Sequence, residues 1–128
     1  MVKILKLLIE KEREINDLMI YTKIFKLHRA HLIMISDHKE MGIGNVVLGN
    51  PPTIEGIKAS VASFELFGLG DDMISKIVVE RAASYLKTSV LLLFFVKSRK
   101  NEENFLKGLV KFLNDILKKI KFDNKTDN

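Results

Sequence analysis

Alternating hydrophobic and polar positions predict five β-strands in the first half of the chain. The clearest is Leu18–Leu27, where apolar side chains fall on both faces of an extended segment. The pattern at the N-terminus fits neither period cleanly, so a helical turn is the alternative there. Short polar or glycine-containing loops join the segments, which favours antiparallel pairing of consecutive strands. The other four predicted strands are Val2–Ile9, Leu32–Ile35, Asn45–Leu48 and Ile57–Phe67.

The second half predicts two amphipathic helices on either side of one more strand. Asp72–Leu86 and Asn101–Ile120 carry apolar residues at three- and four-residue spacing. Between them, Val90–Val96 is apolar on both faces and is expected at the centre of a sheet. These elements predict a single α+β domain over residues 1–122 and a frayed polar tail over residues 123–128. The expected architecture is an antiparallel sheet of about six strands with two helices packed on one face.

Two helices can cover only one face of a sheet of this size. The strands nevertheless carry apolar residues on both faces, most plainly in Val90–Val96. The uncovered face must then either curl on itself or be buried by another chain. We therefore expect a dimer formed through the sheet face away from the helices. A homodimer is favoured, although the sequence leaves a heterodimer open.

The composition is that of an ordinary globular chain. Of its 128 residues, 47% are hydrophobic and 29% are charged, and the longest apolar run is far shorter than the ~20 residues that span a bilayer. The apolar N-terminus is followed by charged residues and not by a small-residue cleavage site, so a cytoplasmic location is expected. The absence of cysteine excludes disulfides and thiolate chemistry, and abundant lysine without glutamine indicates a thermophile.

The formal net charge of +5 raises the question of nucleic-acid binding. The basic residues that would serve are Arg99, Lys100, Lys118, Lys119 and Lys121. They lack the interleaved aromatic residues that single-strand binding usually requires. Lysines near a helix C-terminus also suit the helix dipole. We therefore expect solvated lysines at these positions and no nucleic-acid partner.

Glycine-rich segments do not complete a phosphate-binding motif. Gly44–Gly49 has the glycine spacing of a phosphate loop, but Asn50-Pro51 stands where lysine and serine or threonine would bind phosphate and magnesium. Gly42-Ile43-Gly44 and Gly68-Leu69-Gly70 lack the third glycine of a dinucleotide-binding fingerprint. These glycines are expected in turns or bulges, and no cofactor is expected.

Three histidines and two aspartates are the remaining candidates for chemistry. His28, His31 and His38 have carboxylates nearby, as a zinc or proton-transfer site would need, but their spacing matches no established ligand pattern. We expect the three histidines to lie in turns. Their joint replacement should change the free energy of unfolding by no more than about 1 kcal/mol. Asp71 and Asp72 precede a helix and are expected to stabilise its N-terminus. Neither a catalytic nor a metal site is therefore expected.

One loop is predicted to protrude and to be available to a partner protein. Within Asn50–Gly56, Pro51 and Pro52 stiffen the chain and Ile54 lies at the tip. The alternative, and the simpler one, is a plain hairpin connection. Pro51, Pro52 and Ile54 are the candidate partner-binding residues.

The order of the elements is more informative than any single motif. Ser60–Leu66 leads into the turn Gly68–Asp72, an amphipathic helix follows, and Val90–Val96 precedes a last helix with an asparagine- and glutamate-rich start. Earlier in the chain, the segments Ile24–Leu27 and Leu32–Ile35 are predicted to form a strand pair. This order resembles the small proteasome assembly chaperones, and most closely their fourth-member type in an archaeal-like form. The resemblance covers roughly Asp17–Leu117.

The resemblance implies a small α+β protein with an antiparallel sheet and two helices. Members of this family act as dimers that bind proteasome α-type subunits and promote ring assembly, without catalysis or a cofactor. Some other proteasome chaperones end in a hydrophobic residue, a tyrosine and any third residue, whereas this chain ends Thr126-Asp127-Asn128. The folded domain is therefore expected to make the contact. The alternative is a dimeric adaptor or regulatory domain with another protein partner.

Overall fold

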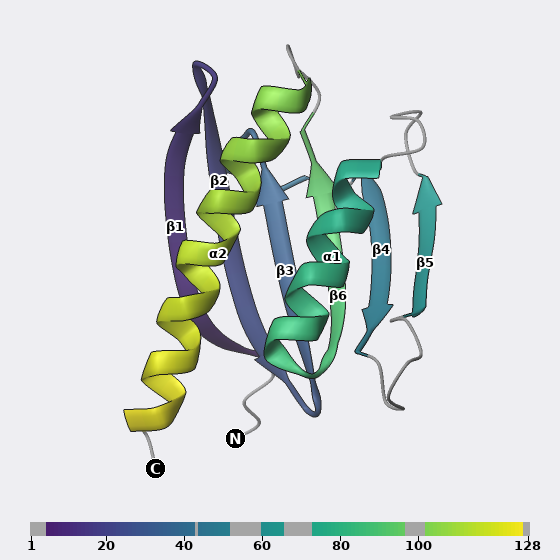
Figure 1. The fold of residues 1–128 in the computed structure, drawn as a ribbon, viewed down its shortest axis with the longest axis vertical. Coiled ribbons are helices and arrows are strands. Elements are labelled where there is room, and N and C mark those ends of the chain that lie inside the picture. The colour runs from purple at the N-terminus through teal and green to yellow at the C-terminus, as the bar shows by residue number, and fades with distance from the viewer. Residues whose placement is uncertain (1–4, 43, 52–59, 66–72, 97–101, 127–128) are drawn as a thin grey trace.

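Both helices of the protein lie on the same face of one β-sheet (Figure 1). The structure is a computed structural model that describes residues 5–42, 44–51, 60–65, 73–96 and 102–126. Its elements in chain order are β1 (Lys6–Ile15), β2 (Leu18–Leu27), β3 (Ala30–Ser36), β4 (Asn45–Asn50), β5 (Ser60–Glu65), α1 (Met73–Leu86), β6 (Ser89–Phe95) and α2 (Glu102–Thr126).

The sheet is mixed and not antiparallel throughout. Its six strands follow the order β1-β2-β3-β6-β4-β5. Strand β3 pairs with β6 in parallel, whereas the other pairings are antiparallel. The predicted pairing of consecutive strands is wrong between β3 and β4, because β6 lies between them. After β3 the chain forms the β4–β5 hairpin and then α1. Strand β6 follows α1 and lies between β3 and β4.

Strand β6 is central, as its apolar sequence predicts. Val90, Leu92 and Phe94 are fully buried on the helix side, and the alternate residues are partly buried on the other side. A strand that is apolar on both faces buries most apolar surface where strands flank it on both sides and other groups cover both of its faces. Its sequence therefore specifies the place of β6, although not the direction of its neighbours.

Strand β1 begins and ends later than the sequence pattern predicts. A register shift between Leu7 and Ile9 moves the alternation by one residue: Leu7 pairs with Phe25, whereas Ile9 pairs with Ile24. Such a bulge explains why no clean period is visible in this segment. The strand ends in a two-residue turn, where Asn16 and Asp17 have φ values of 52° and 65°. Asparagine and aspartate tolerate this left-handed conformation, which matches the twist of a hairpin.

The core lies between the sheet and the two helices. Helix α1 packs on β4, β6 and β5, and helix α2 packs on β1 and α1. The largest buried side chains come from both layers and include Ile20, Ile24, Ile33, Ile35, Leu92, Phe94, Phe105, Leu109, Leu113 and Leu117. Each such side chain contributes ~1.5–3 kcal/mol by leaving water, so this layer supplies much of the stability of the fold.

Helix α2 continues beyond its predicted end at Ile120 to Thr126. It thus includes most of the segment that was expected to be a polar tail. The apolar stripe predicts where the helix packs, but an established helix can add residues at little cost because each one adds a hydrogen bond. The end of the stripe is therefore not the end of the helix.

Helix α2 approaches β1 closely at Gly108. A Cβ atom at this position would lie 2.7 Å from Cγ2 of Ile15, a buried side chain at the end of β1. Real Cβ atoms do not come this close to another carbon, so any larger residue must displace Ile15 or the helix. The glycine is therefore required by packing, against its low helix propensity.

We expect Gly108→Val to lower the free energy of unfolding by about 2 kcal/mol, the usual cost of overpacking. Urea denaturation followed by circular dichroism measures the change. In an Ile15→Ala background the same substitution should cost at least about 1 kcal/mol less, because the space has been opened. Equal costs in both backgrounds would show that the contact does not limit position 108.

His31 is a buried polar residue at the start of β3, with 5% of its surface exposed. Its Nδ1 lies 2.7 Å from Oγ1 of Thr88, and its Nε2 has no hydrogen-bond partner among the described residues. Burial, followed by repulsion from Lys26, lowers the pKa of His31 below its ordinary value of 6.5. The expectation that all three histidines lie in turns is therefore wrong for His31, because this ring is buried within β3.

We expect the protein to lose stability as the pH falls below 6.5. The unfolded chain binds a proton on His31 more readily than the folded one, so protonation favours unfolding. The contribution of His31 is complete above its unfolded pKa and disappears as the pH falls through the lower, folded value. Urea denaturation between pH 7.5 and 5 should show a smaller pH slope for His31→Gln than for the parent. The control is His28→Gln, at an exposed position, which should keep the parent slope.

Candidate protein-binding surface

The sheet face opposite the helices carries a continuous apolar surface. We call it the open sheet face. Successive residues of a strand point to opposite sides, so the residues that alternate with the buried core positions lie here. Its apolar part includes Leu7, Phe25, Leu32, Met34, Val46, Leu48, Leu91, Leu93 and Phe95. All are only partly buried, and Leu48 is 42% exposed.

The strand register aligns these side chains in rows across the sheet. One row is apolar from β1 to β4 and runs Leu7, Phe25, Leu32, Leu91, Leu48. The next row starts with a charged pair and becomes apolar: Glu10, Lys23, Met34, Leu93, Val46. Neighbours in such rows have Cβ atoms about 5 Å apart, close enough for their side chains to touch. The result is a surface of the kind that a monomer seldom leaves exposed.

The loop after β3 covers one end of the open sheet face. The His38 ring lies 5.7 Å from the Phe95 ring, measured between centroids, and a Cβ atom at Gly42 would lie 2.6 Å from Cδ2 of Phe95. The loop is fixed by bonds from Asp37 N to Phe95 O, 3.1 Å, and from His38 N to Ser36 Oγ, 3.0 Å. The apolar surface therefore stays open over the middle of the sheet and closes near Phe95.

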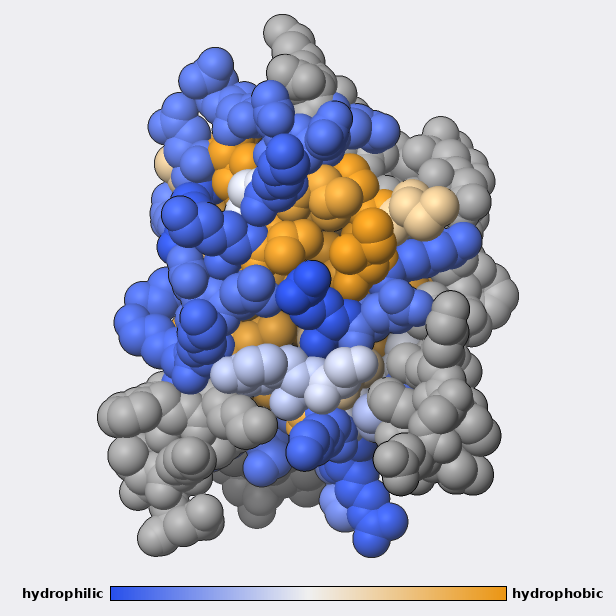
Figure 2. All heavy atoms as spheres, in the orientation of Figure 1, coloured by the Kyte–Doolittle hydropathy of each residue, from blue (hydrophilic) through white to orange (hydrophobic). Residues whose placement is uncertain are grey.

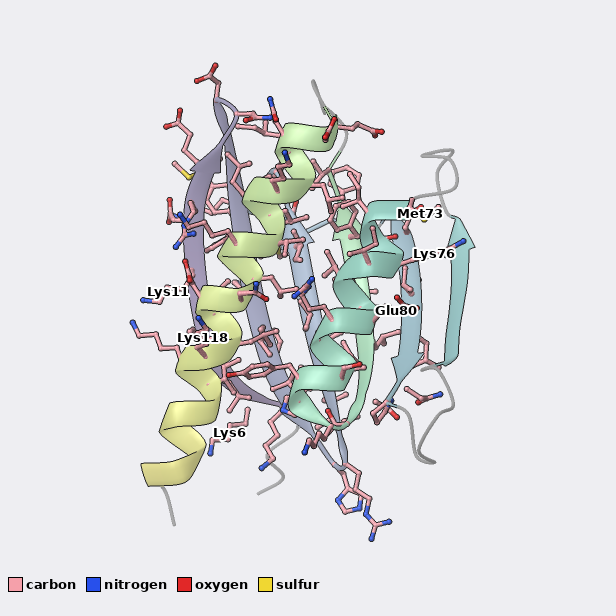
Figure 3. The ribbon with its side chains drawn as sticks, viewed as in Figure 1. Lys6, Lys11, Met73, Lys76, Glu80 and Lys118 are labelled. Carbon is pink, nitrogen blue, oxygen red and sulfur yellow. The ribbon has the colours of Figure 1, made fainter. Side chains whose placement is uncertain are left out.

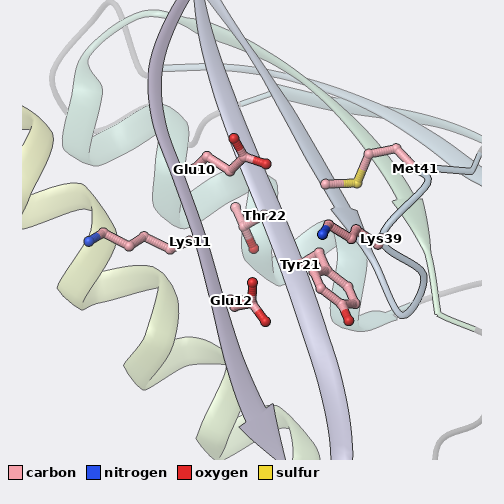
Figure 4. Close-up of a pocket in the computed structure, with 7 residues that line it drawn as sticks. All are labelled: Glu10, Lys11, Glu12, Tyr21, Thr22, Lys39 and Met41. Atoms are coloured by element: carbon pink, nitrogen blue, oxygen red, sulfur yellow. The ribbon is translucent and has the colours of Figure 1, made fainter.

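Charged residues border the open sheet face at β1 and β2. Lys23 Nζ lies 3.7 Å from Glu10 Oε2, in a pair that is partly exposed on both sides. A shallow hollow of about 410 Å³ lies beside this pair, where Tyr21 from β2 and Lys39 and Met41 from the loop meet β1 (Figure 4). An apolar centre with a polar rim is the usual anatomy of a protein–protein contact.

The helix side has a different character. Figure 2 shows hydrophilic residues over much of this side and a hydrophobic patch in its upper half, below which hydrophilic side chains cross the surface. A hollow of about 520 Å³ lies there, lined by Ile77, Glu80, Arg81, Ser84, Tyr85 and Asn114. No helix among the described residues is both long and apolar enough to cross a bilayer.

The histidines do not form a site. His28 lies between β2 and β3, His31 lies within β3, and His38 follows β3 with Nδ1 2.6 Å from Oδ1 of Asp37. Among the described residues, no group of three or more histidine, aspartate or glutamate side chains is placed to hold a metal ion. The three histidines are thus close in sequence, but His28 and His38 lie beyond opposite ends of β3.

Gly49 is not a turn residue, contrary to expectation. It lies within β4, and a Cβ atom there would be 3.2 Å from both γ-carbons of Val79 on α1. The glycine therefore allows α1 to pack closely on the sheet. Most of the segment Gly44–Gly49 belongs to β4. It therefore does not form the loop that phosphate binding needs.

The candidate loop after β4 lies mostly outside the described residues. Pro51 follows β4 and is partly buried, whereas Pro52 and Ile54 fall outside the described ranges, as do Asp71 and Asp72.

The sequence indicated an uncovered apolar sheet face, and the structure identifies its side chains. The rows of apolar side chains could not be predicted from the sequence, because they depend on the pairing of β6 with both β3 and β4.

Comparison with known proteins gives a likeness of fold and none of sequence. No family model and no curated protein matches the chain. The crystal structure of a novel chaperone complex for yeast 20S proteasome assembly contains a similar chain, with a TM-score of 0.57 and 9% sequence identity. The match covers 94% of this chain and 98% of that chain. The protein is therefore similar, over nearly its whole length, to the fold of a chain in a proteasome assembly chaperone complex.

Proposed function

We propose that this protein is a proteasome assembly chaperone that binds proteasome α-type subunits and promotes their assembly into a ring without catalysis. The likeness of fold over 94% of the chain carries the proposal. The order of elements over roughly Asp17–Leu117, which resembles the fourth-member type, supports the same role. We place the protein in the cytoplasm of a thermophilic, archaeal-like cell.

The open sheet face supports the proposal that the chaperone is a homodimer. Its apolar rows need cover, and two copies of the sheet packed face to face bury the rows of both. Edge-to-edge pairing through β1 is disfavoured, since six of its ten residues are charged: Lys6, Glu10, Lys11, Glu12, Arg13 and Glu14. Face-to-face packing is therefore the form of dimer that we propose.

We expect Leu48→Asp to separate the homodimer. Light scattering should give the parent about twice the single-chain mass of 14.6 kDa and the variant a mass near that value. A carboxylate buried in an apolar contact costs at least about 2 kcal/mol, and Leu48 is exposed enough for the single chain to accept the change.

The control for the dimer is Met73→Asp, which places the same charge on α1 at a residue that is 68% exposed. It should leave the mass at the parent value. A parent that scatters as a single chain at micromolar concentration would contradict the homodimer.

We expect the purified protein to co-elute with free recombinant proteasome α subunits and not with mature proteasome. Binding should persist at low and moderate salt, because the proposed contact belongs to the folded domain. Pro51, Pro52 and Ile54 are the proposed contact residues, so Ile54→Asp is expected to weaken binding by ~1–3 kcal/mol. If no free α subunit binds in either salt, the chaperone role is excluded.

A dimeric adaptor with another protein partner is the second candidate function. The observation in its favour is that the open sheet face explains a dimer without specifying what the dimer binds. An affinity pull-down from the source cell extract separates the two roles. Recovery of α subunits supports the chaperone, and reproducible recovery of a different protein alone supports the adaptor.

A further inference from the structure

Lysine side chains from β1 and α2 converge at one edge of the sheet. Lys11 and Lys118 extend past β1 toward the same side of the molecule, and Lys6 lies at the start of β1 (Figure 3). Lys119 is next to Lys118 on the helix, and all four side chains are exposed. We call Lys6, Lys11, Lys118 and Lys119 the lysine patch. Its members are distant in sequence and are brought together by the packing of α2 on β1.

The positive charge of the lysine patch is not neutralised by ion pairs among the described residues. None of its four lysines forms an ion pair with another described residue. The acids of β1 are sorted onto the other side of the strand, because Glu10, Glu12 and Glu14 pair across the sheet with residues of the open sheet face. The nearby Asp115 is engaged by Arg13, with Nη2 and Oδ2 3.0 Å apart. Strand β1 thus presents acids on one face and uncompensated lysines on the other.

Crowding within the patch is strong enough to affect protonation. A hydrogen-bonding contact with Lys119, followed by Coulombic repulsion from the same residue and some desolvation, lowers the pKa of Lys11 from its ordinary value of 10.5. An anion bound between Lys11 and Lys119 would relieve this repulsion.

We propose that the lysine patch docks an acidic segment of a partner protein. Charge complementarity decides the class of partner, because a partner rich in aspartate or glutamate offers carboxylates to four lysines that form no ion pair with another described residue. The small size of the patch favours a peptide over nucleic acid, because four lysines match a short run of carboxylates but neutralise few phosphates of a nucleic-acid backbone. The patch also lies away from the open sheet face, so a dimer leaves it accessible. This inference does not depend on the proposed proteasome partner.

The test is a fluorescence-anisotropy titration of a labelled octaglutamate peptide with the full chain at low salt. We expect saturable binding that weakens as salt is added, as for exposed charge pairs. The double variant Lys11→Glu, Lys119→Glu should bind at least about fivefold more weakly, which corresponds to the loss of two such pairs. Backbone amide shifts on addition of the peptide should be confined to β1 and the second half of α2.

The matched control is Lys107→Glu, which reverses an exposed charge on the same helix, about 16 Å along its axis from Lys118. It should retain the parent affinity. A second variant, Lys11→Gln, Lys119→Gln, serves if the reversed charges disturb folding, and circular dichroism checks both. No binding, or equal loss in the Lys107 control, overturns the proposal. A labelled single-stranded oligonucleotide is tested in the same way. If it binds more tightly than the peptide and is weakened by the same lysine substitutions, the patch binds nucleic acid and the proposal of an acidic protein segment is wrong.

Discussion

The structure depends on the pairing of β6 with both β3 and β4. Without it the sheet consists of two separate pieces, β1–β2–β3 and β4–β5, which share no hydrogen bond. Strand β6 joins them through seven residue pairs to β3 and five to β4. It also aligns the apolar rows that cross the open sheet face. The core on one side and the candidate binding surface on the other thus follow from the same strand.

Much of the element pattern could be predicted from the sequence. The predicted strand Leu18–Leu27 has the bounds of β2, and the predicted first helix differs from α1 by one residue at its start. These segments have clear periods because each keeps one face on the core along its length. Strand β1 was harder to predict, because its bulge interrupts the alternation and its edge position lets charged residues occupy both faces.

The parallel pairing of β3 and β6 could not be predicted from local pattern. Their apolar sequences are equally compatible with parallel and antiparallel neighbours, and the choice is made by the path through β4, β5 and α1. The same limit applies to the lysine patch, whose residues on β1 and α2 are adjacent only after folding. Lys118 and Lys119 were identified as basic residues at a helix end, but nothing in the sequence places Lys11 beside them. His31 was assigned to a turn for a related reason, since its Thr88 partner is distant in the chain.

The late position of β6 has a consequence for how the chain folds. Ala30 pairs with Ser89, so the sheet cannot close until nearly three-quarters of the chain is available. Forming a contact between such distant residues requires closing a long loop before any pairing energy is gained, which slows folding. During synthesis, β3 and β4 leave the ribosome with the edges that will receive β6 still unpaired and apolar. Until β6 follows, these nascent edges are open to pairing with other chains.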